Sequence, residues 1–268
     1  MDILRIHLIQ SDMLWEQARA NRDRLDSTFL EIGKGASDLI LLPEMFTTGF
    51  SMASADLSET MEGPTIQWMK EQSRAMRAAI AGSLIIEDQG RYYNRLIWVD
   101  PDHDDPLYYN KKHLFSLAGE PHHFQAGTEK LTLSYRGWTI ATYICYDLRF
   151  PVWSRNTEGA DLMIYVANFP QKRERAWNGL LPARAIENQC YVAGVNRVGS
   201  DGNGIYHQGD SAIYDYEGQC ILNLGQTEKW AGWSLDRTRL QAFRRAYPFW
   251  KDADHFAILP AHEPKDKI

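Results

Sequence analysis

The sequence is poor in the features that mark several special classes of protein. It has only 3 cysteines among 268 residues, an odd and sparse number that excludes a disulfide framework and suits a reducing compartment. No stretch approaches the ~18 consecutive apolar residues of a membrane span. Basic residues are in the minority, with 29 Lys and Arg against 35 Asp and Glu, which argues against a broad nucleic-acid footprint. The first residues, MDILRIHLIQSD, lack the apolar core and small-residue cleavage site of a secretory signal. We therefore expect a cytoplasmic protein whose partners include neither a membrane nor a nucleic acid.

What the sequence does have is an interleaved series of strand and helix patterns. Apolar runs predict strands, and apolar residues spaced three or four apart predict helices. No linker or short repeat interrupts the series, so we expect one α/β domain over residues 1–268 with a mixed sheet system. The predicted strands cover residues 3–9, 38–42, 79–87, 92–99, two runs within 131–145, 162–166, 191–198, a hairpin at 211–224, and 230–235. The predicted helices cover residues 15–32, 64–79, a short segment after Pro151, 174–189 with Pro182 inside it, and 238–246.

Cys145 is the first candidate for chemistry. An apolar strand leads into it, and Pro151 predicts a short helix soon afterwards. A strand-to-helix turn places a side chain at the carboxyl edge of a sheet, where helix N–H groups favour a thiolate and an oxyanion. The alternative is a small buried hydrophobic residue, as free cysteines often are. Cys190, at the end of a predicted helix, and Cys220, in a predicted hairpin, have no such surroundings.

Glu44 and Lys111 have chemistry that suits catalysis, but their local sequence does not prove it. Glu44 follows a buried strand, where a general base can be placed, although a solvated loop acid fits the same pattern. Lys111 can hold an oxyanion by its charge, although a strand end with two solvated lysines fits equally. His113 reads as a core histidine bonded to backbone, with a general base as the alternative.

No pattern in the sequence predicts a metal or a phosphate site. His122 and His123 are adjacent, so in a strand they point to opposite faces, and no Cys/His pair with ligand spacing accompanies them. The glycines at 199, 202 and 204 do not form the G-x-G-x-x-G arrangement between a strand and a helix. We expect neither a metal nor an organic cofactor.

Four short segments stand out when they are taken together and in order. They are Leu-Pro-Glu at 42–44, Lys-Lys-His-Leu-Phe at 111–115, Cys-Tyr-Asp-Leu-Arg-Phe-Pro at 145–151 and Arg-Ala-Ile-Glu-Asn at 184–188. Together they resemble the nitrilase superfamily of carbon–nitrogen hydrolases. Three further segments, at 43–50, 151–156 and 196–204, are similar to its omega-amidase branch, and to the bacterial group linked to methionine salvage. The resemblance runs from the first strand to the C-terminal helix.

The resemblance implies a four-layer α-β-β-α sandwich that pairs into homodimers or larger homo-oligomers. It also implies a Glu-Lys-Cys triad, which falls on Glu44, Lys111 and Cys145, with a second glutamate at Glu120. In the implied mechanism, the Cys145 thiolate attacks an amide carbonyl and Lys111 stabilises the oxyanion together with a backbone N–H at the turn to Tyr146. Glu44 moves the protons, and a thioester forms and is hydrolysed.

The omega-amidase branch implies a small-molecule substrate, the omega-amide of a 2-oxo dicarboxylic acid such as 2-oxoglutaramate. Arg173 is the first candidate to bind the far carboxylate, because a guanidinium can do so bidentately. The rivals Arg149 and Arg197 can instead form structural ion pairs. The aromatic residues Phe46, Phe169 and Trp177 are candidates to line the pocket, with core packing as the alternative. Two other functions stay open: a carbamoyl-amino-acid hydrolase or nitrilase using the same chemistry, and a non-catalytic scaffold that keeps the fold.

Overall fold

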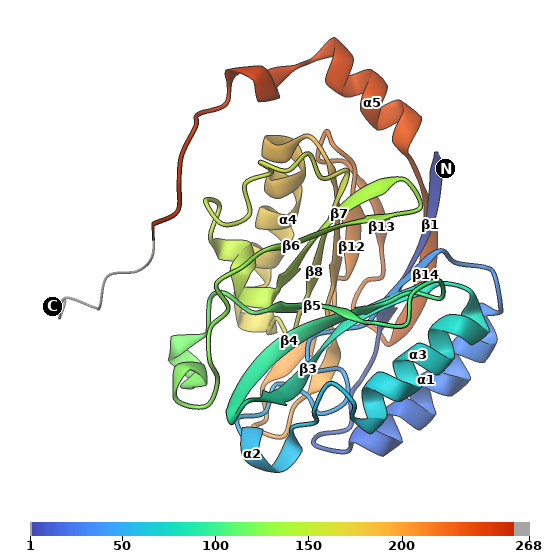
Figure 1. Ribbon diagram of the computed structural model, residues 1–268, viewed down its shortest axis with the longest axis vertical. Coiled ribbons are helices and arrows are strands. Elements are labelled where there is room, and N and C mark those ends of the chain that lie inside the picture. Colours follow the sequence, from blue (N-terminus) through green and yellow to red (C-terminus); the bar gives the residue numbers. More distant parts are fainter. Residues whose placement is uncertain (1, 260–268) are drawn as a thin grey trace, which may run out of the picture.

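Two six-stranded mixed sheets form the centre of the molecule (Figure 1). The computed structural model describes residues 2–259 of the 268. In spatial order, the first sheet consists of β14 (Lys229–Asp236), β1 (Ile3–Gln10), β2 (Leu39–Leu41), β3 (Ala79–Asp88), β4 (Arg91–Val99) and β5 (Leu107–Asn110). The second consists of β13 (Cys220–Asn223), β12 (Ala212–Tyr214), β9 (Tyr191–Val195), β8 (Leu162–Val166), β7 (Trp138–Ile144) and β6 (Leu131–Tyr135).

Helices cover the outer faces of both sheets, which confirms the predicted four-layer α-β-β-α sandwich (Figure 1). Apolar residues of α1 and α3 pack on the first sheet in one core cluster, and a larger cluster fills the space between the sheets and beneath α4. The five α-helices among the described residues are α1 (Ala18–Ile32), α2 (Ser54–Leu57), α3 (Pro64–Met76), α4 (Glu174–Asn188) and α5 (Arg237–Ala246). A two-stranded hairpin of β10 (Val198–Ser200) and β11 (Tyr206–Gln208) stands apart from the sheets.

Strand directions place the ends of β2 and β5 at one edge of the first sheet. In the first sheet β2 runs parallel to β3, and β3–β4 and β4–β5 are antiparallel pairs. It follows that β2 and β5 point the same way and end at the same edge of that sheet. In the second sheet β7 and β8 are parallel. The residues that follow β2, β5 and β7 carry the candidate chemistry described below.

The short helix predicted after Pro151 is wrong. The structure instead has a 3₁₀ helix at Cys145–Arg149, which begins at the cysteine itself, and only turns at residues 151–154. Phe150, which precedes the proline, is extended with φ −112° and ψ 89°, because the proline ring disfavours helical backbone in the residue before it. The helix N-terminus expected beyond Cys145 is therefore this 3₁₀ turn.

Other differences from the predicted elements concern their boundaries. The first helix begins at Ala18 rather than at residue 15, and Glu16 has a left-handed φ of +57° that interrupts a helix there. The second ends at Met76, after which Arg77 adopts a left-handed cap. Pro182 lies inside α4 as predicted. The short α2 and the β10–β11 hairpin were not predicted. Within residues 2–259, no helix combines the length and apolarity needed to cross a membrane.

Candidate active site

Glu44, Lys111 and Cys145 come from three different strand ends and meet in one place. Glu44 follows β2, Lys111 directly follows β5, and Cys145 directly follows β7. The side chains of Glu44 and Lys111 are 0% and 1% exposed. Contacts between residues so far apart in sequence depend on the sheet order, so tertiary structure alone brings the three together.

Lys111 lies between two buried carboxylates. Its Nζ donates to Oε1 of Glu44 at 2.8 Å and to both carboxylate oxygens of Glu120 at 3.0 Å. Glu120 Oε2 also accepts the backbone N–H of Phe115 at 2.5 Å. The second glutamate expected from the family resemblance therefore contacts the lysine directly, and the ammonium compensates part of the charge of both acids.

Burial and charge act in opposite directions on the lysine. Burial would lower the pKa of Lys111, but the carboxylates of Glu120 and Glu44 outweigh this effect and raise it. Burial raises the pKa of Glu120, Lys111 opposes this shift, and Glu44 adds to it. At neutral pH the lysine is therefore a fixed cation.

Cys145 sits on a sharp turn beside this cluster. Its φ is +44°, a left-handed conformation that non-glycine residues rarely adopt. The side chain of Asp147 stabilises the turn, since its Oδ2 accepts the N–H of Ile144 at 3.1 Å and the hydroxyl of Tyr109 at 2.7 Å. Strained backbone of this kind often occurs at functional sites.

The Cys145 thiol lies close enough to Glu44 and to the backbone N–H of Asn168 for both groups to affect its pKa. Burial and the Glu44 carboxylate raise the pKa of the thiol well above its usual value, and Lys111 opposes the shift. The resting group is therefore a neutral thiol with a carboxylate next to it. Such a thiol needs a base to become a nucleophile, and Glu44 is placed to be that base.

The other cysteines lie elsewhere, as predicted. Cys190 is buried just after α4, and Cys220 is exposed on edge strand β13. Neither contacts Glu44 or Lys111 in the described part of the chain.

Asn94 is a site residue that the sequence reasoning missed. It lies within β4, and its side-chain amide donates to Oε1 of Glu44 at 2.7 Å and to Oε1 of Glu120 at 3.2 Å. A signal was present in the sequence, because asparagine is depleted in strands and this one sits in a strand next to the apolar run that begins at Leu96. Asn168 was also missed, and its backbone N–H donates to Glu44 Oε2 at 2.8 Å.

Among residues 2–259, the histidines lie apart from the Glu44–Lys111–Glu120 cluster. The core position predicted for His113 is wrong: its ring is partly exposed, stacks on Phe150, and has Nδ1 at 2.8 Å from Asp147 Oδ1. Asp147 offers that ring a carboxylate partner, which outcompetes a backbone carbonyl. His122 and His123 are exposed. Across residues 2–259, no group of three or more His, Cys, Asp or Glu side chains is placed to hold a metal ion.

Arg173 lies near Cys145, close enough for their charges to interact. Its guanidinium stacks over Phe115 at 4.5 Å and lies 6.0 Å from the ring centre of Phe169. Within residues 2–259 it forms no salt bridge. The guanidinium of Arg149 also faces an aromatic ring, at 5.8 Å from the ring centre of Phe169, and Arg149 forms no salt bridge within residues 2–259.

The remaining candidate residues divide between the site and the core. Tyr146 is partly exposed and packs edge-on against Phe115 with ring centres 5.0 Å apart. Trp177 is buried behind Phe169 and donates its ring N–H to the Asp210 carbonyl. Phe46 packs on Trp68 in the core beneath α3, which fits core packing, one of the two alternatives given for it.

Arg197 is a structural residue. Its side chain is fully buried and donates to the carboxylate of Asp12 and to the backbone carbonyls of Met13, Val198 and Ser200. These bonds tie the β10 hairpin to the segment after β1, which leaves this arginine unsuited to bind a substrate carboxylate.

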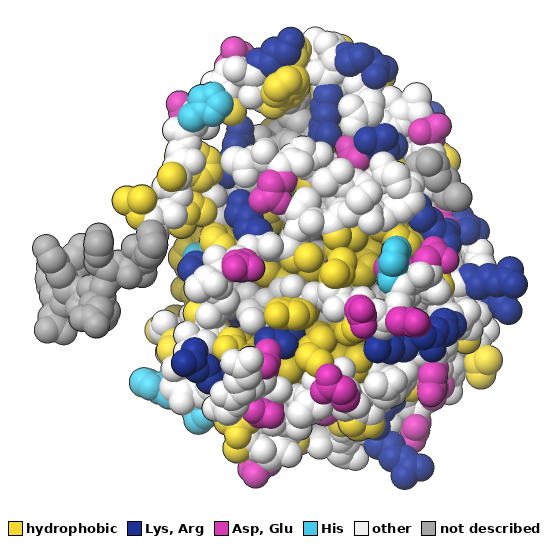
Figure 2. Space-filling model, in the orientation of Figure 1, with side chains coloured by type: hydrophobic (Ala, Val, Ile, Leu, Met, Phe, Trp, Pro, Cys, Tyr) yellow, Lys and Arg dark blue, Asp and Glu magenta, His cyan; other side chains and the backbone are white. Residues whose placement is uncertain are grey.

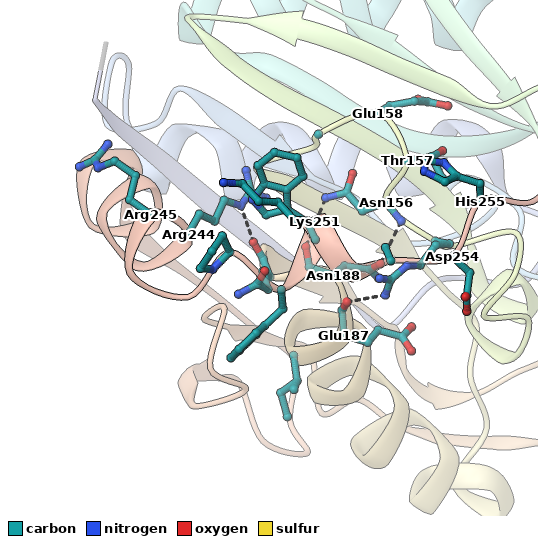
Figure 3. A pocket seen from close by; sticks show the side chains of 18 of the residues that line it. Asn156, Thr157, Glu158, Glu187, Asn188, Arg244, Arg245, Lys251, Asp254 and His255 are labelled. Carbon is teal, nitrogen blue, oxygen red and sulfur yellow. Dashed lines mark hydrogen bonds between the residues drawn. The ribbon is translucent and has the colours of Figure 1, made fainter.

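A separate cavity lies away from Cys145. It has a volume of about 1090 Å³ and lies between α4, α5 and the segment after α5, and its lining includes Glu187, Arg244 and Trp250 (Figure 3). It contains neither the cysteine nor the lysine–carboxylate cluster. The buried titratable groups, rather than this cavity, therefore mark the candidate site.

Comparisons of sequence and of structure with known proteins lead to the same family. The sequence profile of the family described as carbon–nitrogen hydrolase matches residues 5–245. An omega-amidase YafV from Yersinia enterocolitica is 44% identical over 97% of this chain and 100% of its own length. A 2-oxoglutaramate amidase from Bacillus subtilis is 32% identical over 92% of this chain and 96% of its own. The crystal structure of XC1258 from Xanthomonas campestris, a CN-hydrolase superfamily protein with an arsenic adduct in its active site, superposes with a TM-score of 0.94 at 41% identity, covering 96% of this chain and 100% of that one.

Proposed function

The chain belongs to the carbon–nitrogen hydrolase family, within the omega-amidase branch of the nitrilase superfamily, and from this premise we propose that it hydrolyses the omega-amide of a 2-oxo dicarboxylic acid monoamide, such as 2-oxoglutaramate, to the acid and ammonia. The observation that carries the proposal is the buried Glu44–Lys111–Glu120 cluster beside the thiol of Cys145. These groups are the nucleophile, base and cation that amide hydrolysis through a thioester requires.

In the first half-reaction, Cys145 attacks the amide carbonyl. The thiol proton passes to Glu44 as the sulfur–carbon bond forms, and the carbonyl oxygen becomes an oxyanion. Lys111, whose charge is fixed by two carboxylates, and a backbone N–H at the turn to Tyr146 stabilise that oxyanion. Glu44 then gives the proton to the amide nitrogen, the carbon–nitrogen bond breaks, and ammonia leaves a thioester on Cys145.

In the second half-reaction, water replaces the nitrogen group. Glu44, again a carboxylate, takes a proton from the water as its oxygen attacks the thioester carbon. The tetrahedral intermediate breaks its carbon–sulfur bond, the proton returns to the sulfur, and the acid is released. Glu120 holds Lys111 in place throughout.

Substrate selection is assigned to Arg173. The proposed substrate carries a carboxylate at the end away from the amide, and burying that charge without a partner is costly. Arg173 forms no salt bridge within residues 2–259 and lies near Cys145, so its guanidinium is available for that carboxylate. Phe169 and Tyr146 are its aromatic neighbours in the proposed pocket, with Trp177 behind Phe169.

A substrate panel tests the proposal. Ammonia release is measured with omega-amides of several chain lengths, with carbamoyl amino acids and with nitriles, each at one enzyme concentration. We expect the omega-amides of 2-oxo acids to give the highest kcat/KM and a mass increase on Cys145 that matches the acyl group. Preference for a carbamoyl amino acid or a nitrile would reassign the substrate, and the absence of any acyl adduct would point to a non-catalytic scaffold.

We also propose that the protein works as a homodimer or a larger homo-oligomer. Figure 2 shows hydrophobic side chains along the left edge, over the segment that leads away from α5 in Figure 1. This segment exposes Phe249 and Trp250 to 62% and 60%, and contiguous exposed apolar surface of this kind marks interaction sites. Sedimentation velocity tests the proposal, and a monomer at micromolar concentration would contradict it.

A cytoplasmic location is proposed on the basis of the thiols. All three cysteines are free, which fits a reducing compartment. Fractionation of cells that express the protein, followed by detection in each fraction, tests this location.

A further inference from the structure

Asn94 connects the two carboxylates of the site. Its side-chain amide has two hydrogens, and it donates one to Glu44 Oε1 at 2.7 Å and the other to Glu120 Oε1 at 3.2 Å. Its backbone carbonyl accepts the N–H of Lys111 at 2.9 Å. One residue in the middle of β4 thus contacts both acids and the lysine backbone.

Ser83 fixes the orientation of that amide. Its hydroxyl donates to Asn94 Oδ1 at 2.8 Å and accepts the N–H of Met45, the residue after Glu44, at 2.8 Å. A hydroxyl that accepts one bond and donates the other leaves the asparagine oxygen facing Ser83 and the NH₂ facing the carboxylates. Asn94 and Ser83 are both fully buried, so water does not compete for these bonds.

This arrangement distinguishes the two oxygens of Glu44. Oε1 accepts from both Asn94 and Lys111, and these two donors occupy both of its lone pairs. Oε2 accepts only the N–H of Asn168 among the hydrogen bonds to Glu44 within residues 2–259, and one lone pair is left. The Cys145 thiol lies next to this same carboxylate.

We propose that Asn94 is a positioning residue that occupies Glu44 Oε1 and so leaves Oε2 as the atom that accepts the Cys145 proton. The proton leaves the sulfur for Oε2 as the sulfur–carbon bond forms, and it later passes from Oε2 to the departing nitrogen. The inference rests on the proposed function for its role in turnover, but the proton transfer itself can be tested without a substrate.

The test is the pH dependence of Cys145 alkylation by iodoacetamide in the full chain. A Cys220→Ser background removes the exposed thiol, and intact mass reports the rate from about pH 5 to about pH 9. Hydrogen bonds donated to an ionised carboxylate lower its pKa. Asn94→Asp keeps the size and the bond from Ser83, removes both donors and adds a carboxylate next to Glu44. Both changes disfavour the ionised form of Glu44, so the acidic side of the pH–rate profile should move up by at least about one to two pH units, the size of one charge-assisted hydrogen bond.

The matched control is Asn223→Asp, which makes the same chemical change on exposed edge strand β13. It should reproduce the profile of the background. If Asn94→Asp does not fold, Ser83→Ala replaces it, because loss of that hydroxyl frees the amide to rotate away. That variant should shift the acidic side of the profile in the same direction by a smaller amount.

Turnover of the omega-amide provides the second readout. Asn94→Asp should lower kcat by about 10- to 100-fold with little change in KM. The acidic side of the pH profile of kcat/KM should shift by the same amount as that of the alkylation rate. An alkylation profile that coincides with the Asn223→Asp control would overturn the inference. If the profile shifts but no omega-amide is hydrolysed by either protein, the proposed substrate is wrong and the role of Asn94 stands.

Discussion

Removal of the buried cation is the sharpest test of how the site is held together. Lys111→Met keeps a long unbranched side chain but deletes the ammonium that lies 2.8 Å from Glu44 and 3.0 Å from Glu120. Both carboxylates are fully buried and would lose their compensating charge. Breaking a buried ion pair by removing one partner costs ~3–5 kcal/mol of stability, and we expect a loss of that size at pH 8.

The stability lost in Lys111→Met should depend on pH, and the direction of this dependence follows from the number of protons bound by the folded and unfolded chains. The pKa of Glu120 is already raised by burial, and loss of Lys111 raises it further. The native variant then holds one more proton than its unfolded chain, so its stability falls as pH rises, by about 1.4 kcal/mol per pH unit. The gap to wild type should therefore be smallest near pH 5 and grow toward pH 8.

Titration of Lys111 itself does not contribute to the pH dependence of stability between about pH 5 and about pH 9. The pKa of Lys111 is raised in the folded state, so its contribution to stability is complete below its unfolded value of about 10.4. In wild type that contribution is constant from about pH 5 to about pH 9. Any pH-dependent difference there comes from the carboxylates.

Urea unfolding followed by tryptophan fluorescence measures the effect, with extrapolation to water at three pH values. Lys112→Met is the matched control, since that neighbouring lysine is partly exposed and its ammonium lies 5.1 Å from the Trp153 ring centre. It should change stability little and equally at each pH. A Lys111→Met loss that is the same at pH 5 and pH 8 would refute the reasoning, because uncompensated acids would then be absent.

Further predictions concern the nucleophile, the base, the substrate carboxylate and metals. Cys145→Ala should abolish turnover, while Cys190→Ala and Cys220→Ser keep most of it, as ammonia release will show. Glu44→Gln should lower kcat by about 10²–10⁴-fold with KM largely retained, and a change confined to KM would contradict a role as base. Arg173→Ala should narrow the kcat/KM ratio between acid substrates and their methyl esters by about 10- to 100-fold, and Arg149→Ala should do so less. Dialysis against a chelator should leave activity unchanged, and a loss restored by zinc would contradict the thiol mechanism.

The sheet architecture could be predicted because its signals are local. The apolar runs at β1, β3, β4 and β8 each fit a strand buried on at least one face, and the structure confirms them. Boundaries were less accurate where backbone conformation decides them. Glu16 and Arg77 adopt left-handed φ values of 57° and 58°, and neither residue type announces this in the sequence.

The site was predictable to the extent that motifs at strand ends resemble those of a known family. Glu44, Lys111 and Glu120 were chosen by that resemblance, and the structure brings them within hydrogen-bonding distance. Asn94 was missed although an asparagine within a strand is itself unusual. Its partners lie 50 and 26 residues away, so the local sequence does not show which residues it contacts. For Phe46, the alternative of core packing was correct, since aromatic residues near a site more often pack than bind.

The base and the nucleophile share a backbone feature that connects fold to chemistry. Met45, directly after Glu44, and Cys145 have left-handed φ values of 43° and 44°, and each such non-glycine residue costs about 1–3 kcal/mol. A side-chain oxygen stabilises each turn: Ser83 accepts the N–H of Met45 at 2.8 Å, and Asp147 accepts that of Ile144 at 3.1 Å. Ser83 also orients Asn94, so the group that holds the strained turn after Glu44 is the one that sets the hydrogen bonds on the Glu44 carboxylate. Loss of this hydroxyl should therefore affect backbone and proton transfer together, which no substitution at the protein surface can reproduce.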